Sequence, residues 1–209
     1  MEVIDIAKKI EQYGGRLYLV GGAVRDEFLK VKNTDEDYCV VGLSCEEFES
    51  MFPNAYKRGK DFPVYDIDGK EFAMARKEKK VGEGHTKFEI EISKNITIED
   101  DLKRRDITIN SKDVLTGKII DPFNGIKDIN DKVIKMTSSA FSEDPLRVYR
   151  VARFAAVLEF NVDEKTICEM KRIKEELKTL SSERVFMEFK KALNSKRPSI
   201  FFEVLRKSE

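Results

Sequence analysis

The hydrophobic periodicity of this sequence changes once along the chain, and that change restricts the fold more than any other feature. Before about residue 98, short β-branched and aromatic runs alternate with Gly, Pro and Asp, which is typical of strands. After about residue 140, apolar residues recur at helical spacing. The sequence therefore predicts an α+β fold, with a small mixed, largely antiparallel sheet flanked by helices, followed by an all-helical segment.

The individual elements follow from the same patterns. Helices are predicted at 3–13, 23–30, 141–158, 163–177 and 182–195, with another beginning near Pro198 and a helical pattern taking over at about residue 98 in "TIEDDLKRRDITIN". Strands are predicted at 16–22, 37–41, 62–67, 71–76 and 86–93. The glycines at 14 and 15 end the first helix.

The charge balance limits what the protein can attract. Lys and Arg together number 39, as do Asp and Glu, and the sequence pI is about 6.7. A nucleic-acid partner would therefore need a local basic face, because no global field attracts it. No apolar stretch reaches the roughly 20 residues of a membrane span, and the N-terminus does not read as a signal peptide. These features predict a cytoplasmic protein without membrane association.

Cysteine and histidine are too few to carry the chemistry. Cys39, Cys45 and Cys168 are scattered and lack CxxC spacing, which favours reduced thiols over a disulfide or a zinc site. His85 is the single histidine, so histidine-based triads and histidine-rich metal sites are nearly excluded. Any catalysis would depend on carboxylates and arginines.

Acidic residues crowd the start of one predicted strand in "KNTDEDYCVV" (32–41). Residues two apart in a strand share a face, so Asp35 and Asp37 would point the same way, about 7 Å apart. Two such carboxylates repel one another but suit Mg²⁺, which prefers one or two protein carboxylates plus phosphate oxygens. The alternative for an isolated DxD is a solvated turn.

A glycine pair precedes these acids. In "LVGGAVRDEFL", Gly21 and Gly22 lie between an apolar strand and a helix that carries Arg25. Glycines at this position let backbone N–H groups approach a phosphate at a helix N-terminus. The alternative is an ordinary tight turn.

Six motifs in register resemble those of the class II tRNA nucleotidyltransferases, the bacterial CCA-adding enzymes and their poly(A) polymerase relatives, within the DNA polymerase β-like superfamily. The motifs are "LVGGAVRD" (19–26), "DEDYCVVG" (35–42), "EDDLKRRDITIN" (99–110), "DPFNG" (121–125), "EDPLRVYRVARF" (143–154) and "SSERVFMEF" (181–189). The resemblance extends from about Leu17 to Arg206, nearly the whole chain. It implies a polymerase β-like catalytic head over 1–140 and a helical, nucleotide-selecting neck over 141–209.

The resemblance also implies roles for individual residues. Asp35 and Asp37 would hold two Mg²⁺ ions, with Glu71 as a third acid unless it is simply an exposed strand residue. The residues implied to bind nucleotide are Gly21, Gly22, Arg25, Arg105, Asp106, Asn110, Asp144, Arg147, Arg150 and Arg153. Within this set, Asp106 would order its loop and Asn110 would lie near the sugar. Glu183, Arg184 and Glu188 would brace the nucleotide-binding helix.

The helix that begins near Asp144 also permits an argument from the residues. Val151, Phe154, Ala155 and Leu158 form its buried stripe, and Asp144 and Arg147 lie at the N-terminal end of that stripe. An i,i+3 salt bridge at a helix start would explain Asp144 well and Arg147 in part. Alternatively, the carboxylate accepts from the amino group of cytosine or adenine while the guanidinium donates to the adjacent ring nitrogen. Guanine and uracil present the reverse order.

Family members usually have about twice this length, so we expect the body, tail and phosphohydrolase domains to be absent here. A partner subunit could supply tRNA binding. The segment "ARKEKKVGEGHTKF" (75–88) resembles the family's flexible loop and favours complete CCA addition. The predicted activity is template-independent addition of C and A to tRNA 3′ ends from CTP and ATP, with release of pyrophosphate. Two alternatives remain: a poly(A) polymerase or A-adding enzyme with another acceptor, and a non-catalytic nucleotide- or RNA-binding subunit.

Overall fold

The computed structural model describes residues 1–32, 35–59, 62–80, 88–108 and 111–209. Its contacts divide the chain into two compact units. The sheet unit comprises Met1–Glu78, Ile90–Lys103 and Ile109–Gly125, and the helical unit comprises Lys79–Glu89, Arg104–Thr108 and Ile126–Glu209. The predicted boundary between a head over 1–140 and a neck over 141–209 stays a prediction.

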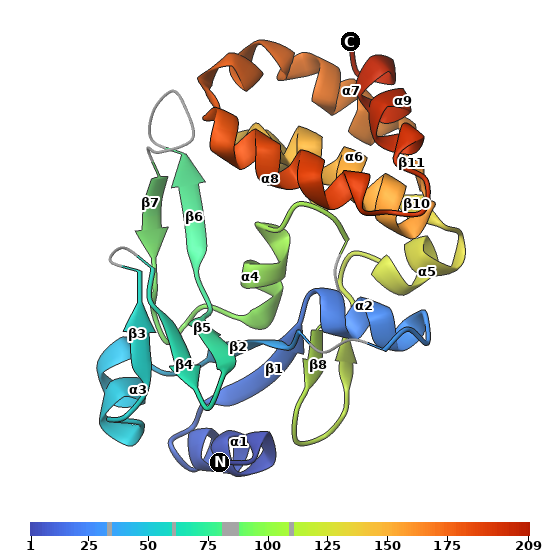
Figure 1. The fold of residues 1–209 in the computed structure, drawn as a ribbon. Helices are drawn as coiled ribbons and strands as arrows, with labels where there is room; N and C mark the ends of the chain where they lie inside the picture. Colours follow the sequence, from blue (N-terminus) through green and yellow to red (C-terminus); the bar gives the residue numbers. More distant parts are fainter. Residues whose placement is uncertain (33–34, 60–61, 81–87, 109–110) are drawn as a thin grey trace. The chain divides into compact units, whose positions relative to one another are not determined.

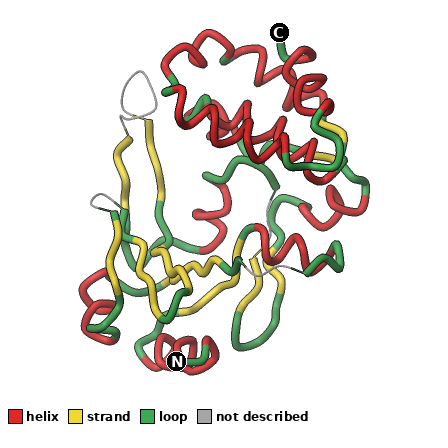
Figure 2. The backbone as a smooth tube through the Cα atoms, viewed as in Figure 1, coloured by secondary structure: helices red, strands yellow, loops and turns green. Residues whose placement is uncertain are grey.

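A seven-stranded mixed sheet forms the centre of the sheet unit, in the order β3-β4-β5-β2-β1-β8-β9 (Figures 1 and 2). Its strands are β1 (Arg16–Val20), β2 (Asp37–Val41), β3 (Tyr56–Arg58), β4 (Val64–Ile67), β5 (Lys70–Met74), β8 (Ser111–Asp113) and β9 (Ile119–Ile120). β2 and β5 run parallel, whereas the other neighbouring strands in this sheet run antiparallel. The predicted mixed, largely antiparallel sheet is confirmed.

The helices of the sheet unit are short. They are α1 (Val3–Gln12), α2 (Gly22–Phe28), α3 (Cys45–Met51) and α4 (Ile98–Lys103). The apolar side of α1 is buried in one core with the sheet residues Tyr65 and Phe72. α3 was not predicted, although Ser44 and Glu47 form a reciprocal capping box at its start, a signal that is visible in the sequence.

The helical pattern predicted from about residue 98 to 110 is wrong beyond Lys103, where α4 ends. Ile107 instead forms an isolated antiparallel bridge with Met136. The β-branched run of Ile and Thr that follows the arginines explains this difference, because such residues favour extended backbone. Asn110 lies outside the described residues.

The helical unit is built around α6 (Leu146–Leu158), which packs against α8 (Ser182–Leu193) and α9 (Ser199–Lys207). Its other elements are α5 (Gly125–Asn130), α7 (Glu164–Arg172), 3-10 helices at Ser139–Glu143 and Lys174–Thr179, and a short parallel pair of β10 (Val133–Ile134) and β11 (Asn161–Val162). β6 (Lys77–Lys80) and β7 (Phe88–Glu91) form a separate two-stranded sheet. Val151 and Ala155 on α6 are fully buried, as their helical spacing predicts.

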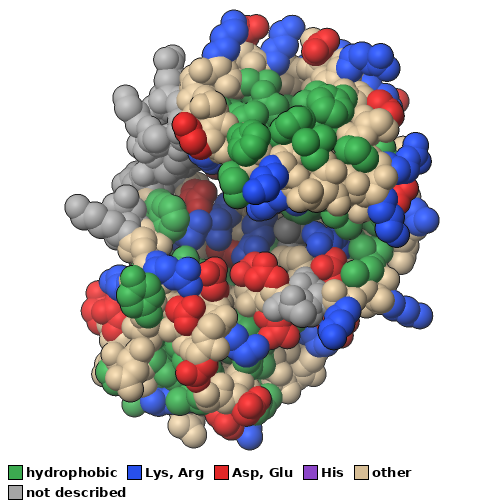
Figure 3. Space-filling view, in the orientation of Figure 1, with side chains coloured by type: hydrophobic (Ala, Val, Ile, Leu, Met, Phe, Trp, Pro, Cys, Tyr) green, Lys and Arg blue, Asp and Glu red, His purple; other side chains and the backbone are tan. Residues whose placement is uncertain are grey.

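The surface of α8 and α9 carries large apolar side chains, which Figure 3 shows gathered on one face. Phe186 is 58% exposed and Phe202 is 50% exposed, and both pack against the ring of Phe189. Among the described residues, none of the helices has the length and apolar content that crossing a membrane would require.

Candidate active site

The register of the sheet places two of the predicted catalytic acids next to each other. Asp37 begins β2 and pairs with Glu71 on β5, at neighbouring backbone positions about 4.8 Å apart. Asp35 lies just before the strand rather than within it, and both aspartates are exposed. Glu36 accepts hydrogen bonds from Tyr38 at 2.7 Å and from Lys70 at 2.8 Å. The Glu36 carboxylate is thus held by two neighbouring side chains.

Glu71 is itself engaged in an ion pair. The Arg58 guanidinium on β3 lies 3.1 Å from Glu71 and 2.9 Å from Asp66 on β4, and Asp66 is the antiparallel partner of Glu71. Asp66, Glu71 and Asp37 therefore occupy one row across three neighbouring strands. Like charges at directly opposed positions are destabilising, and the guanidinium offsets that repulsion for the first two.

The chemistry of the two aspartates fits magnesium. Mg²⁺ is usually held by one or two carboxylates together with waters and substrate phosphates. Within the described residues, no three Asp, Glu, His or Cys side chains converge into a cluster that could hold a metal by themselves. Asp35 and Asp37 thus suit a magnesium site completed by a triphosphate. Glu71 pairs with Arg58 in this structure.

The predicted phosphate loop takes a conformation that requires glycine. Gly21 has φ 73° and ψ −135°, a backbone conformation that residues other than glycine rarely adopt. Gly22 is the first residue of α2. Arg25 on α2 forms a two-pronged ion pair with the adjacent Asp26, at 2.8 Å from Nε and 2.7 Å from Nη2. The position of the guanidinium is therefore set within the helix that carries it.

Asp106 is almost fully buried and is held from two sides in the helical unit. One carboxylate oxygen accepts the Ile107 N–H at 3.1 Å, and the other accepts Arg150 Nε at 2.6 Å. Burial alone would raise the pKa of Asp106, but the charge of Arg150, with smaller effects from Arg147, lowers it below its ordinary value. The Asp106 carboxylate is therefore fixed by a backbone N–H and by Arg150. Arg105 beside it is half-buried.

The ion-pair network continues from α6 to α8. Glu188, which is 4% exposed, accepts a hydrogen bond from Arg153 and lies 3.9 Å from Arg150. The nearby charge of Asp106 raises the pKa of Arg150, while burial lowers that of Arg153. Both arginines, predicted to contact nucleotide, thus pair with buried carboxylates in the helical unit, and Glu188 on α8 lies close to both of them.

Asp144 and Arg147 are each fixed by partners within the helical unit. The Asp144 carboxylate accepts the Leu146 N–H at 3.1 Å and pairs with Arg184 on α8 at 3.0 Å. Arg147 is 7% exposed, and its guanidinium donates to the backbone carbonyls of Ala140 and, at 2.6 Å, Arg104. The orientation of both side chains is therefore set by the surrounding residues.

Two residues near the acids were not predicted as site residues. Asp66 lies in a predicted strand, but nothing in the sequence specifies its pairing with Glu71. β3 was not predicted, so Arg58 had no expected place in the sheet. The signal that could have found β3 is weak, because it is a three-residue strand, "YKR".

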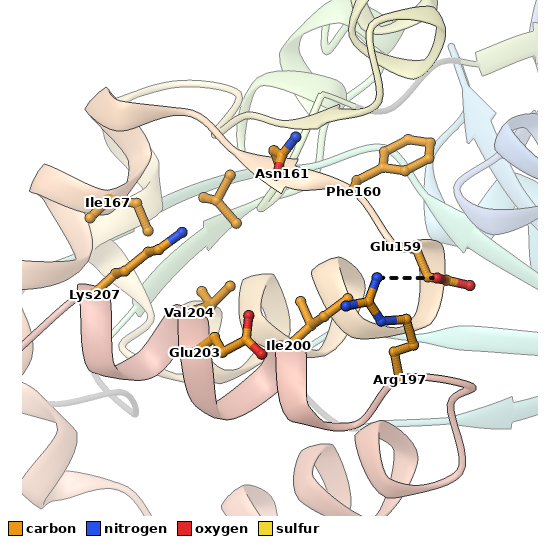
Figure 4. A pocket seen from close by; sticks show the side chains of 10 residues that line it. Glu159, Phe160, Asn161, Ile167, Arg197, Ile200, Glu203, Val204 and Lys207 are labelled. Atoms are coloured by element: carbon orange, nitrogen blue, oxygen red, sulfur yellow. Dashed lines mark ion pairs between the residues drawn. The ribbon is translucent and has the colours of Figure 1, made fainter.

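A cavity of about 180 Å³ lies in the helical unit (Figure 4). None of the residues that line it was predicted as a site residue. Arg197 faces Glu159 across it at 4.0 Å, and Asn161 and Lys207 also line it. Charged side chains of both signs line this cavity.

The sheet with its row of carboxylates and the helical segment that follows define the nucleotidyltransferase head fold. The sequence matches the family described as "Poly A polymerase head domain" over residues 17–135 and that described as "Probable RNA and SrmB- binding site of polymerase A" over residues 159–209. The chain belongs to the poly A polymerase head domain family. The resemblance to CCA-adding enzymes inferred from the six motifs is confirmed.

Individual relatives agree. A CCA-adding enzyme of Blochmanniella floridana is 47% identical over 197 residues, covering 91% of this chain and 47% of that protein. The crystal structure of the Bacillus stearothermophilus CCA-adding enzyme in complex with CTP has a TM-score of 0.81 and 28% identity, covering 98% of this chain and 51% of that one.

A tRNA nucleotidyltransferase complexed with a primer tRNA and an incoming ATP analog has a TM-score of 0.76 and 31% identity, covering 99% of this chain and 60% of that one. The chain spans about half the length of the curated relatives it matches.

Proposed function

We propose that this chain is a template-independent RNA nucleotidyltransferase that adds C and A to tRNA 3′ ends from CTP and ATP. In this reaction the RNA 3′-hydroxyl oxygen bonds to the α-phosphorus, its proton is lost, and pyrophosphate leaves. The similarity to CCA-adding enzymes over nine-tenths of the chain supports this assignment. We further propose a cytoplasmic location, as for a protein that acts on tRNA.

Asp35 and Asp37 would hold Mg²⁺. When bound there, the metal lowers the pKa of the RNA hydroxyl and neutralises charge on the triphosphate and on pyrophosphate. We propose that Arg25 contributes a fixed positive charge toward the phosphates, since Asp26 holds its guanidinium in place.

The observation that carries the proposal is that Asp144, two residues before α6, and Arg147, in its first turn, lie three residues apart and are each fixed by partners of their own. A carboxylate accepts hydrogen bonds and a guanidinium donates them. Cytosine and adenine offer an amino donor beside a ring-nitrogen acceptor, which matches this order. Uracil and guanine offer a carbonyl acceptor beside an N–H donor, the reverse order, so they would oppose acceptor to acceptor and donor to donor.

A second function is favoured by the family description itself, which names poly(A) polymerase. Such an enzyme would use the same acids and the same base-selecting pair but would add A only, to other RNA 3′ ends.

A primer-extension assay tests these proposals. Purified protein with Mg²⁺ receives tRNAs that end before CCA, after C and after CC, with each nucleoside triphosphate offered separately. Stepwise addition of C, C and A establishes CCA addition, whereas addition of A alone to any RNA establishes the poly(A)-type activity. Absence of incorporation in the presence of bound nucleotide contradicts autonomous catalysis.

A further inference from the structure

The row of carboxylates in the sheet contains more negative charge than a two-aspartate metal site requires. Asp66, Glu71 and Asp37 lie at directly paired positions on β4, β5 and β2, which lie side by side in Figure 1. Each neighbouring pair of like charges is unfavourable. A cation between Asp37 and Glu71 would relieve one repulsion, and Arg58 already relieves the other.

Arg58 reaches both of its carboxylates through the same nitrogen, Nη2. Its pair with Asp66 spans neighbouring strands of the sheet edge, and its reach to Glu71 extends one strand further inward. Glu71 is therefore drawn toward β3, whereas Asp37 lies on its other side, on β2. The two cations, guanidinium and metal, would approach the same carboxylate from opposite sides.

We propose that Arg58 competes with a divalent cation for Glu71, and that Glu71 joins Asp35 and Asp37 only after the metal displaces the guanidinium. This inference rests on the proposed metal site. It assigns Arg58 as a positioning residue for Glu71. It also accounts for the absence of a three-ligand metal cluster among the described residues.

A metal ion can compete with Arg58 because the ion pair between Arg58 and Glu71 is half exposed to water. The Arg58 and Glu71 side chains are 47% and 48% exposed. Exposed ion pairs of this kind contribute little, since water and salt screen them. A divalent cation supported by two further carboxylates can therefore displace Arg58, whereas a buried pair would resist displacement.

The test is Mn²⁺ binding to the complete chain without nucleotide, measured by isothermal titration calorimetry and by electron paramagnetic resonance. Four proteins form a double-mutant cycle: wild type, Arg58→Gln, Glu71→Gln and the double variant. Arg58→Gln should bind Mn²⁺ about two- to fivefold more tightly at low salt, the range of an exposed ion pair. The gain should disappear in the Glu71→Gln background, because the proposed competition acts through that carboxylate.

Lys57→Gln is the matched control. Lys57 is on the same strand but pairs with Glu49 at 2.8 Å, and as the neighbour of Arg58 it points to the opposite face of the sheet. Its replacement removes one positive charge and should leave Mn²⁺ affinity unchanged. Arg58→Lys, which retains the charge, should give an intermediate affinity and provides a second variant should Arg58→Gln fold poorly.

The outcomes separate this proposal from the proposed function. Unchanged or weaker Mn²⁺ binding by Arg58→Gln, with binding that still depends on Asp37, overturns the role of Arg58 alone. An equal gain with and without Glu71 also overturns it, since that result indicates a general charge effect. Absence of Mn²⁺ binding in every variant overturns the metal site as well.

Discussion

Two groups of ion pairs, one in the sheet unit and one in the helical unit, differ in their burial. In the sheet unit, Arg58 and Glu71 meet at roughly half exposure, and Asp35 and Asp37 are exposed. In the helical unit, Asp106 and Glu188 are nearly fully buried, with arginines as partners. A carboxylate in a solvent-exposed ion pair can exchange one cation for another, whereas a buried carboxylate that loses its partner remains an uncompensated charge. The exposed arrangement suits metal binding, and the buried arrangement suits a rigid packing of α6 against α8.

The largest expected effect is on catalysis, from removal of an exposed acid. Asp37→Ala should reduce incorporation by on the order of 10³-fold or more, because the metal contributes several kcal/mol of transition-state stabilisation. Primer extension measures the loss, and circular dichroism should remain that of the wild type, since Asp37 lies outside the core. The matched control is Glu36→Ala, an adjacent acid with its own partners, which should stay within a few-fold of wild type. Equal losses in both variants would contradict the assignment.

Breaking the buried network should affect stability most. Asp106→Asn should lower the free energy of unfolding by about 3 kcal/mol, since it removes the buried carboxylate that pairs with Arg150 at 2.6 Å and leaves Arg150 with the more distant carboxylate of Glu188, at 3.9 Å. Urea denaturation followed by circular dichroism measures this change. Glu175→Gln, which removes an exposed pair with Lys178, should change stability by less than about 0.5 kcal/mol. Similar effects of the two substitutions would show that burial does not set the strength of these ion pairs.

Arg184→Gln tests whether the ion pair between Arg184 and Asp144 controls nucleotide choice. Asp144 would keep its bond to the Leu146 N–H but lose the ion pair that fixes its second oxygen. The ratio of kcat/KM for CTP to that for UTP should fall about tenfold, as expected for loss of a hydrogen bond to a charged group. Arg184→Lys should restore part of the ratio. A decrease in stability with unchanged selectivity would make Arg184 purely structural.

Acid should weaken the helical unit through Asp106. Because the pKa of Asp106 is lowered in the folded protein, its ionised form contributes stability above the ordinary aspartate pKa of about 3.9, and this contribution is lost as pH falls through the lowered value. The difference in unfolding free energy between wild type and Asp106→Asn should be constant from about pH 5 to 8 and should shrink below about pH 4. A difference in unfolding free energy that grows as the pH falls would contradict a lowered pKa for Asp106.

The smallest expected effect is on stability at the sheet edge. Arg58→Gln should change the free energy of unfolding by less than about 1 kcal/mol, because both of its partners are accessible to water. The same urea measurement applies, at low and high salt. A loss as large as that of Asp106→Asn would show that Arg58 is a structural residue, and the contrast between the two units would be wrong.

Elements with a long, regular pattern were predictable from sequence. The periodicity of α1, α6 and α8 gave their positions, because each buries one apolar face. Very short strands such as β3 and β9 were missed, since two or three residues carry no period. The sequence after Lys103 was misassigned because charged residues that continue a helical pattern precede a β-branched run.

The candidate site was predictable as a set of residues but not as a set of contacts. Glu71 was named from family resemblance, yet its pairing with Asp37 depends on a parallel register between strands distant in sequence. Arg150 and Arg153 were expected to contact nucleotide, and their buried carboxylate partners could not be read from helical spacing. Asn110 and residues 81–87 of the predicted loop over 75–88 lie outside the described residues.

The parallel pairing of β2 with β5 has a consequence for how the chain folds and how its length can vary. The connection between these strands carries α3, β3 and β4, so Asp37 and Glu71 become neighbours only after a long loop has closed. Doubling such a loop costs only about 0.6 kcal/mol in closure entropy. A slip of one residue, by contrast, would turn Glu71 to the opposite face. Insertions in the connection should therefore be tolerated, while single-residue deletions inside β5 should remove Glu71 from its row.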